Sequence, residues 1–290
     1  MSECCSKVLT RYHEQIDTTV ETMRRRCVHM YDLGTAVPQR VQRYLEKLRE
    51  WAEPAALDYK DYVTAALNEK GNLNTESKDT RNDLVELYLG IGVLTLAMAS
   101  GFISGSSLGG LIDYALDPIC IYLLLAVIPV YTYLYINKVA VFDETEIRSV
   151  LFCMVLAESF LAGHLIGYRM AAFIPAAAFI PPVITGLLID REISPANLFS
   201  DRDKFLIFCG TGSAVVAIGL AYPFGAVSFG AIICILLHTA LLAVHFQLTM
   251  AEKKSNAFSS GQSQFVYMLS LIAVHVLCAF VFGSPTPPEN

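Results

Sequence analysis

Long apolar segments alternate with short polar ones over the last two-thirds of this 290-residue chain. A membrane-spanning helix needs about 20 mostly apolar residues, because the hydrocarbon is about 30 Å thick and a helix rises about 1.5 Å per residue. Seven segments meet this requirement: 84–102, 118–136, 149–168, 170–189, 205–222, 225–249 and 265–282. The pattern therefore predicts an all-α, polytopic membrane protein with seven transmembrane helices.

Turn and helix-breaking residues set several of these boundaries. No Asp, Glu, Lys or Arg occurs between Lys204 and Glu252, and the Tyr-Pro-Phe-Gly sequence at 222–225 supplies the turn that divides the fifth span from the sixth. Only Arg169 separates the third span from the fourth, so a tight hairpin is expected there. Prolines predict kinks in the second and fourth spans, whose freed carbonyls neighbouring helices must cover: Pro129, Pro175, Pro181 and Pro182.

The first 83 residues are polar and predict a cytosolic helical region with two amphipathic helices and a linker. Their apolar residues recur at three- and four-residue steps. The first stripe is Val8, Tyr12, Ile16, Val20, Met23, Cys27 and Met30, and the second is Val41, Tyr44, Leu45, Leu48 and Trp51. The two helices could pair with each other, bind a protein partner or lie on the membrane surface. A seven-helix domain at 84–283 and a short polar tail at 284–290 complete the predicted organisation.

The distribution of charge supports the same organisation. Apolar residues make up 54% of the chain and charged residues 17%, against about 45–50% and about 25% in soluble domains. The net charge of −6 provides no basic surface for nucleic acid. With a cytosolic N-terminus and seven spans, ten Lys and Arg residues near the membrane lie inside and only Arg169 lies outside. This bias predicts a cytosolic N-terminus.

Ionisable residues within membrane spans are costly, so each is a functional candidate. Glu158 lies midway along the third span, and His275 lies midway along the seventh. His238 and His245 are seven residues apart in the sixth span, which places them on one face. Together with Arg148 before the third span, these residues are the candidates for an ion pathway or its gate. Glu158 could instead join helices, and each histidine could be a hydrogen-bonded packing residue.

A metal-dependent membrane hydrolase is the alternative function. One class of seven-span hydrolases holds zinc with three histidines, two of them close together on one helix. His238 and His245 are about 10.5 Å apart along a regular helix and cannot share one ion. The five cysteines within apolar segments are expected to act as small hydrophobic residues, and there is no CxxC pair. We therefore expect a non-enzymatic protein without catalytic residues, bound metal or cofactor.

The order of features resembles the Bax inhibitor-1 family of small organellar membrane proteins. The resemblance extends from Asn74 to Phe282. Its elements are the polar stretch at 74–77, Leu-Val-Glu-Leu-Tyr at 84–88, the small residues at 97–101, the acidic loop at 143–146 with Arg148, the glycines at 163 and 167, the segment at 174–179, and His-Phe-Gln-Leu at 245–248. The family's proline after the third-span glycine is absent, because Tyr168 follows Gly167.

The resemblance implies an endoplasmic-reticulum or other endomembrane protein associated with a pH-sensitive calcium leak and with regulation of cell death. The family attributes its leak to two aspartates that share a proton and close the pore. His245 and Ser270 stand at the matching positions, and neither is acidic. The resemblance thus implies the same fold, with the lipid bilayer and calcium as expected partners. It does not imply the di-aspartate sensor.

Overall fold

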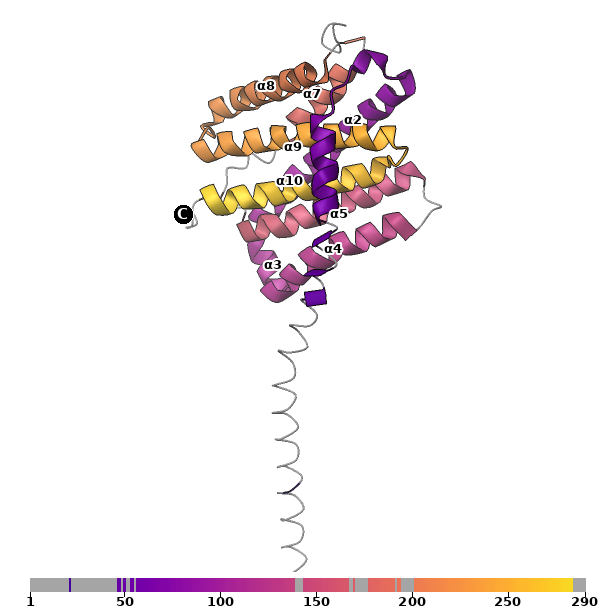
Figure 1. Cartoon of the computed structure of the whole chain (residues 1–290). Helices are drawn as coiled ribbons and strands as arrows, with labels where there is room; N and C mark the ends of the chain where they lie inside the picture. The colour runs from indigo at the N-terminus through magenta and orange to yellow at the C-terminus, as the bar shows by residue number, and fades with distance from the viewer. Residues whose placement is uncertain are drawn as a thin grey trace, which may run out of the picture. The chain divides into compact units, whose positions relative to one another are not determined.

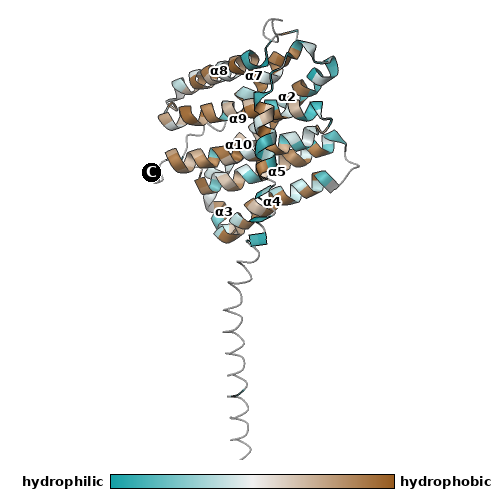
Figure 2. Cartoon of the chain, in the orientation of Figure 1, coloured by the Kyte–Doolittle hydropathy of each residue, from teal (hydrophilic) through white to brown (hydrophobic). Residues whose placement is uncertain are grey.

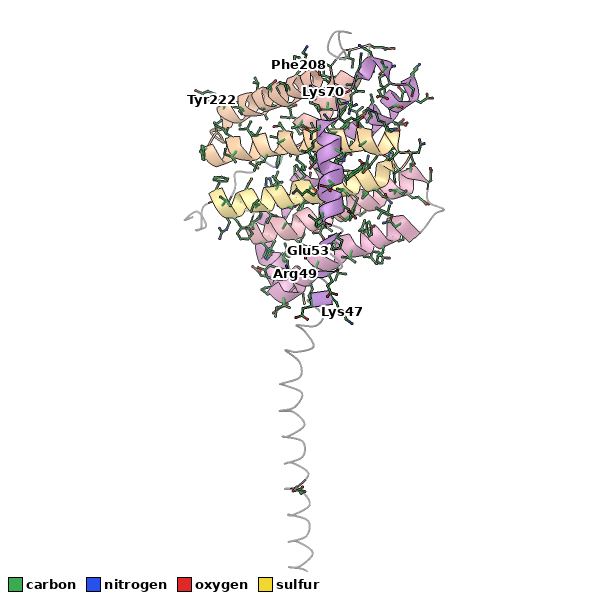
Figure 3. The ribbon with its side chains drawn as sticks, viewed as in Figure 1. Lys47, Arg49, Glu53, Lys70, Phe208 and Tyr222 are labelled. Carbon is green, nitrogen blue, oxygen red and sulfur yellow. The ribbon has the colours of Figure 1, made fainter. Side chains whose placement is uncertain are left out.

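The computed structural model describes residues 21, 46–47, 49–50, 53–54, 56–138, 143–166, 169, 177–190, 192–193 and 201–283. The chain divides into two compact units, Met1–Thr64 and Ala65–Asn290. In the first unit residues 56–64 are helical, and Arg49 pairs with Glu53 at 3.4 Å on an exposed surface (Figure 3). The apolar residues of both predicted amphipathic stripes lie outside the described residues, as does the tail at 284–290.

The described part of the second unit is helical and contains no strand. Six of its helices are long and apolar enough to cross a membrane. This confirms the predicted all-α, polytopic membrane class. In chain order the elements are η1 (Leu73–Thr75), α2 (Lys78–Ser107), α3 (Gly109–Ala115), α4 (Pro118–Lys138), α5 (Glu144–Ile166), α7 (Ile180–Ile189), α8 (Arg202–Ala221), η4 (Tyr222–Phe224), α9 (Phe229–Lys254) and α10 (Ser260–Phe282).

The predicted fourth span contains a short helix, α7, of ten residues. Pro181 and Pro182 occupy its first turn, where a missing backbone N–H costs little. Before this segment, Arg169 lies 5.4 Å from the ring centroid of Phe280, near the C-terminal end of α10. After it, Asp190 borders a cavity at the first turns of α2. Arg169 and Asp190 therefore lie at opposite ends of the bundle, and six of the seven predicted spans are found among the described helices.

The long helices pack side by side, and α2 forms the centre of the packing. Helices α8, α9, α10, α5 and α4 follow one another across the bundle in Figure 1, and each contacts the next. Helix α2 contacts α5 most extensively and also packs on α7 and α10. Most of the fully buried apolar side chains belong to one core around α2, including Leu84, Tyr88 and Met98.

Glycines allow α2 and α5 to approach closely. A Cβ atom on Gly105 would lie 2.0 Å from the carbonyl oxygen of Phe160, and one on Gly163 would lie 2.5 Å from the carbonyl oxygen of Phe102. Gly101 faces Ser159 in the same way. Gly101 and Gly105 form the small-xxx-small spacing that lets membrane helices meet backbone to backbone. The two helices run in the same direction, because Glu86 and Gly105 of α2 meet early and late residues of α5 respectively.

The two ends of the bundle differ in the number of basic residues that they carry. At one end, called the basic end, Arg148 pairs with Glu86 at 3.1 Å, Lys253 pairs with Asp83 at 2.6 Å, and Lys254 pairs with Glu69. At the opposite end the short helix α3 is joined to α5 by His164 and Asp113, 3.0 Å apart, and Arg169 lies near α10. These positions agree with the sequence prediction that Arg169 stands apart from the other basic residues.

Gly71 and Leu73, which precede the predicted boundary at 83, pack with the membrane helices. The backbone N–H of Arg202 donates to the carbonyl oxygen of Gly71 at 3.0 Å, and Leu73 is buried in the main core. The predicted turn at 222–225 is confirmed, since η4 ends at Gly225 in the left-handed region with φ of 65°.

The outer helices present apolar side chains away from the core. Along α4, eight large apolar or aromatic side chains are exposed, and only a small share of this helix is buried. Phe208 and Tyr222 project from the outer side of the α8 region (Figure 3), and the spans are predominantly apolar in colour in Figure 2. Exposed apolar surface of this extent suits contact with lipid. The chain is thus suited to be an integral membrane protein.

Candidate functional site

A polar cavity of about 320 Å³ opens at the basic end between α2, α5 and α10, and is called the vestibule. Three carboxylates and one guanidinium line it: Asp83, Glu86, Glu144 and Arg148. Arg148 is the centre of this charge cluster, because its Nη2 lies 3.1 Å from Glu86 and 3.3 Å from Glu144. The candidate Arg148 therefore links α2 to α5 at the mouth of a cavity whose carboxylates outnumber its cations.

Gln264 of α10 lies at the inner limit of the vestibule. It is 1% exposed, and neither its amide oxygen nor its amide nitrogen has a hydrogen-bond partner among the described residues. Gly90 of α2 provides the space for this amide, since a Cβ atom there would lie 2.5 Å from Gln264 Nε2. A buried amide without partners is costly, so the position favours a role in contact with polar species entering from the vestibule.

Further polar atoms without partners follow deeper in α5 and α10. Tyr267 Oη, Glu158 Oε1 and His275 Nδ1 are buried, and none finds a hydrogen-bond partner in the described part of the chain. Both helices start beside the vestibule. At the rise of a helix, Glu158 and His275 lie at a similar depth, about 21–23 Å along the axes from Glu144 and Ser260. Glu158 is 3% exposed and adjoins Ser159, which packs on Gly101 of α2.

His245 belongs to a closed hydrogen-bond network. Its Nε2 lies 3.0 Å from both the carbonyl oxygen and the hydroxyl of Ser263, and its Nδ1 lies 3.2 Å from the Tyr88 hydroxyl. A carbonyl oxygen only accepts, so Nε2 carries the proton and Nδ1 accepts from the Tyr88 O–H. Both ring nitrogens are therefore satisfied by a neutral imidazole, and His245 joins α2, α9 and α10.

The contact between α9 and α10 has a regular antiparallel register, and is called the α9–α10 seam. His238 and His245 both face α10, as their seven-residue spacing predicts. Ser270 lies one turn beyond Tyr267 and is half-buried, so the structure pairs His245 with Ser263 and Tyr267 rather than with Ser270. The paired residues along the seam are Thr249 with Ser263, His245 with Tyr267, His238 with His275, and Gly230 with Phe282.

His238 and His275 meet a cysteine on the seam. The two imidazole rings stack with centroids 5.9 Å apart, and Cys234 Sγ lies 3.6 Å from His238 Nε2. One ligand atom from each of Cys234, His238 and His275 lies within 4.8 Å of the others, and all three residues are buried. This is the group of described residues that could hold a metal ion. His245 is not part of it, which agrees with the expectation that His238 and His245 cannot share an ion.

Arg202 is a buried cation that the sequence did not mark as a site residue. It is 1% exposed, donates from Nη1 to Gln247 Oε1 at 2.9 Å, and makes no ion pair with a described carboxylate. Its guanidinium lies against Gly71, where a Cβ atom would be 1.9 Å from Nη2. The sequence placed Arg202 among the basic residues flanking a span, and nothing in its spacing indicates Gln247 as a partner.

The sequence patterns also did not identify several other polar residues of the interior. Tyr88, Ser263 and Gln264 are ordinary residues in their segments, and they become notable only through burial and partners contributed by another helix. Cys234 and His238 do have a visible signal, because their four-residue spacing places both on one helix face.

The resemblance to the Bax inhibitor-1 family remains a prediction based on the residues quoted above. Comparison with known proteins adds no relative: no family model, no curated protein and no solved structure matches this chain.

Proposed function

We propose that this protein is a non-enzymatic endomembrane cation pathway of the Bax-inhibitor type, with its mouth at the vestibule and Glu158 as its deep polar group. The observation that supports the proposal is that buried polar atoms without a partner among the described residues occur both at the vestibule, in Gln264, and deep in α5, in Glu158. Calcium is the proposed ion. Regulation of calcium homeostasis or of cell death, and residence in the endoplasmic reticulum, form the cellular part of the proposal and rest on the resemblance alone.

The charges at the mouth favour a cation. The vestibule carboxylates Asp83, Glu86 and Glu144 share only two cations, Arg148 and Lys253, and an excess of carboxylates at a pore entrance concentrates cations. Hard oxygen ligands are the ones calcium prefers. A buried carboxyl such as Glu158 can then replace part of the hydration shell of a passing ion.

Calcium flux in vesicles tests the proposal. The full chain is reconstituted with a calcium-sensitive dye inside, and flux is compared with that of protein-free vesicles. We expect flux above that background, and a change of about fivefold or more in Glu158→Gln, which keeps shape and removes the charge. Thermal stability in detergent should stay nearly constant in this variant. Asp203→Asn, an exposed carboxylate at the same end but outside the vestibule, is the matched control.

Flux equal to background in all variants would contradict the proposal. A change in the stability of Glu158→Gln with unaltered flux would assign Glu158 to helix packing instead.

The dependence of flux on pH follows from His245. His245 is held as a neutral imidazole in a buried network, and any proton that it gains on acidification adds positive charge, unlike protonation of the aspartates of the family. A positive charge in the sixth predicted span opposes cation passage, so flux should not increase between pH 8 and pH 6. His245→Asp with Ser270→Asp should introduce an acid-sensitive leak. Strong acid-stimulated flux in the unmodified protein would mean that Glu158 or another carboxylate senses pH.

The proposed orientation has a cytosolic N-terminus, so that the vestibule faces the cytosol. Glycosylation acceptor sites inserted between residues 105 and 116 should be modified in cells, whereas sites inserted between residues 253 and 262 should not. The reverse pattern would place the vestibule on the lumenal side.

The membrane-embedded hydrolase is the weaker alternative. Its metal would have to bind at Cys234, His238 and His275, and this group includes no carboxylate that could serve as a general base among the described residues. The non-enzymatic proposal needs no such group.

A further inference from the structure

Four potential metal ligands lie near the end of the α9–α10 seam that is farther from the basic end. Cys234 and His238 are one turn apart on α9, and His275 and Cys278 are one turn apart on α10. The two cysteines pack in one small core cluster. All four residues are at most 2% exposed. Two ligands from each of two adjacent helices form the donor set of a Cys2His2 zinc site.

The distances on the seam suit a tetrahedral ion. Zinc binds sulfur at about 2.3 Å and imidazole nitrogen at about 2.0–2.1 Å, which places sulfur and nitrogen ligands about 3.5 Å apart in a tetrahedron. Cys234 Sγ and His238 Nε2 are 3.6 Å apart. The ligand atoms of Cys234, His238 and His275 lie within 4.8 Å of one another, so small side-chain rotations bring them to one ion. Cys278 lies outside this group of three but packs in the same core cluster as Cys234, and its side chain would have to turn towards the ion to complete the tetrahedron.

His275 provides an independent indication of a ligand. It is 1% exposed, its ring packs on Phe102 with centroids 4.6 Å apart, and its Nδ1 has no partner among the described residues. His245 on the same seam has both nitrogens satisfied. A buried imidazole nitrogen without a partner is costly, and a metal ion would satisfy a ring nitrogen of His275.

The charge of the complex fits its apolar surroundings. When zinc binds, two S–H bonds break, two Zn–S bonds form and two protons leave to water. The divalent ion with two thiolates and two neutral imidazoles then has no net charge, so burying it in the bilayer leaves no uncompensated ion. The site lies about 6–10 Å along α10 from the end of that helix, which is close enough to the surface for an ion to enter.

We infer that Cys234, His238, His275 and Cys278 bind one zinc ion that joins α9 to α10. This site is separate from the vestibule and does not depend on cation flux, so it goes beyond the proposed function. The ion would act structurally, as zinc does where four protein ligands fill the tetrahedral positions. Removing it should lower stability, since an ion that binds only the folded state stabilises that state.

Metal content tests the inference directly. The full chain is purified in detergent with a tag that contains no histidine or cysteine, incubated with zinc, and freed of excess ion. Elemental analysis should find one zinc ion per chain. Cys234→Ser and His275→Gln should each lose zinc by about tenfold or more. Cys153→Ser, which removes an exposed thiol on α5, is the matched control and should retain the ion.

Cobalt provides a second measurement that needs no variant. Cobalt in place of zinc in the unmodified protein should give the visible absorption of a tetrahedral ion and the near-ultraviolet charge transfer of two thiolates. Chelation should lower the thermal midpoint of unmodified protein and leave that of His275→Gln unchanged.

Three outcomes would overturn the inference. The first is the absence of both zinc and the cobalt spectrum in folded protein. The second is zinc retained by all variants, and the third is a disulfide between Cys234 and Cys278 in protein kept under reducing conditions.

Discussion

Helices α2 and α8 both contain several glycines, but the surroundings of these glycines differ between the two helices. In α2, Gly101 and Gly105 meet the backbone and Ser159 of α5 so closely that a Cβ atom would collide. In α8, Gly210, Gly212 and Gly219 have nothing within 4 Å of a Cβ position. The comparison teaches that glycine content does not by itself indicate a packed membrane helix. A glycine that lies close to the backbone of a neighbouring helix does indicate such packing. The polar interior of this protein lies along α2, the helix with these glycines.

The largest expected effect is that of Gly105→Ala. Its Cβ would lie 2.0 Å from the carbonyl oxygen of Phe160 and 2.9 Å from the carbonyl carbon, so α2 and α5 must separate. We expect the free energy of unfolding to fall by about 3 kcal/mol, at the upper range for overpacking. Unfolding in detergent, followed by circular dichroism, measures it. Unchanged stability would mean that α2 and α5 do not meet at Gly105.

The second test asks whether the polar contacts of α2 match its backbone contacts in strength. His245→Leu removes the acceptor of the Tyr88 hydroxyl and the donor to the Ser263 carbonyl oxygen, while the Ser263 hydroxyl keeps its contact with Thr249. Buried groups left unpaired cost about 1–3 kcal/mol, and we expect a loss of about 2 kcal/mol. Tyr88→Phe, which removes one partner only, should cost less. A loss below about 0.5 kcal/mol in His245→Leu would exclude the closed network.

The third test separates side-chain from backbone contact at Gly101. A Cβ there would lie 1.9 Å from Ser159 Oγ and 2.8 Å from the carbonyl oxygen of Leu156. Gly101→Ala should destabilise the protein, and adding Ser159→Ala should restore about 1 kcal/mol, because the hydroxyl is removed. The double-mutant cycle in detergent gives this coupling directly. Strict additivity of the two substitutions would contradict the contact.

The smallest expected effect is that of Gly212→Ala in α8, and its sign is opposite. The new methyl group enters open space, and alanine favours the helix over glycine by about 0.8–1.0 kcal/mol. The same unfolding experiment should show a gain of about 0.5 kcal/mol. Destabilisation would indicate a partner against this face of α8.

The sequence predicted the long helices well because the length of an apolar segment is a local property. Helix α4 begins at Pro118 as predicted, and α10 ends at Phe282 as predicted. Helix α2 begins six residues before the predicted 84, because Ser77 accepts a hydrogen bond from the N–H of Thr80 and starts the helix in the polar flank. The short helix α3 has too few residues to register as a span.

The geometry of the candidate site could be predicted only where the spacing of residues within one helix indicates it. The seven-residue spacing of His238 and His245 indicated a shared face, and both contact α10. Cys234 was expected to be a small hydrophobic residue, because its relation to His275 depends on the register between two helices. That register comes from packing, and no spacing within one helix reveals it. The same reason explains why Ser270, chosen by resemblance, is not the residue opposite His245.

The regular register of the α9–α10 seam has a mechanical consequence. Its contacts recur at spacings of one or two helical turns, so sliding one helix by a single residue would break all of them together, and the next compatible position is a whole turn away. Lys253 and Lys254 at the end of α9 pair with Asp83 of α2 and with Glu69, so movement of α2 against the hairpin would first have to break the Lys253–Asp83 pair. The hairpin should therefore move as one rigid lever, and opening of the interior would require α2 and α5 to tilt against it rather than α9 and α10 to shear.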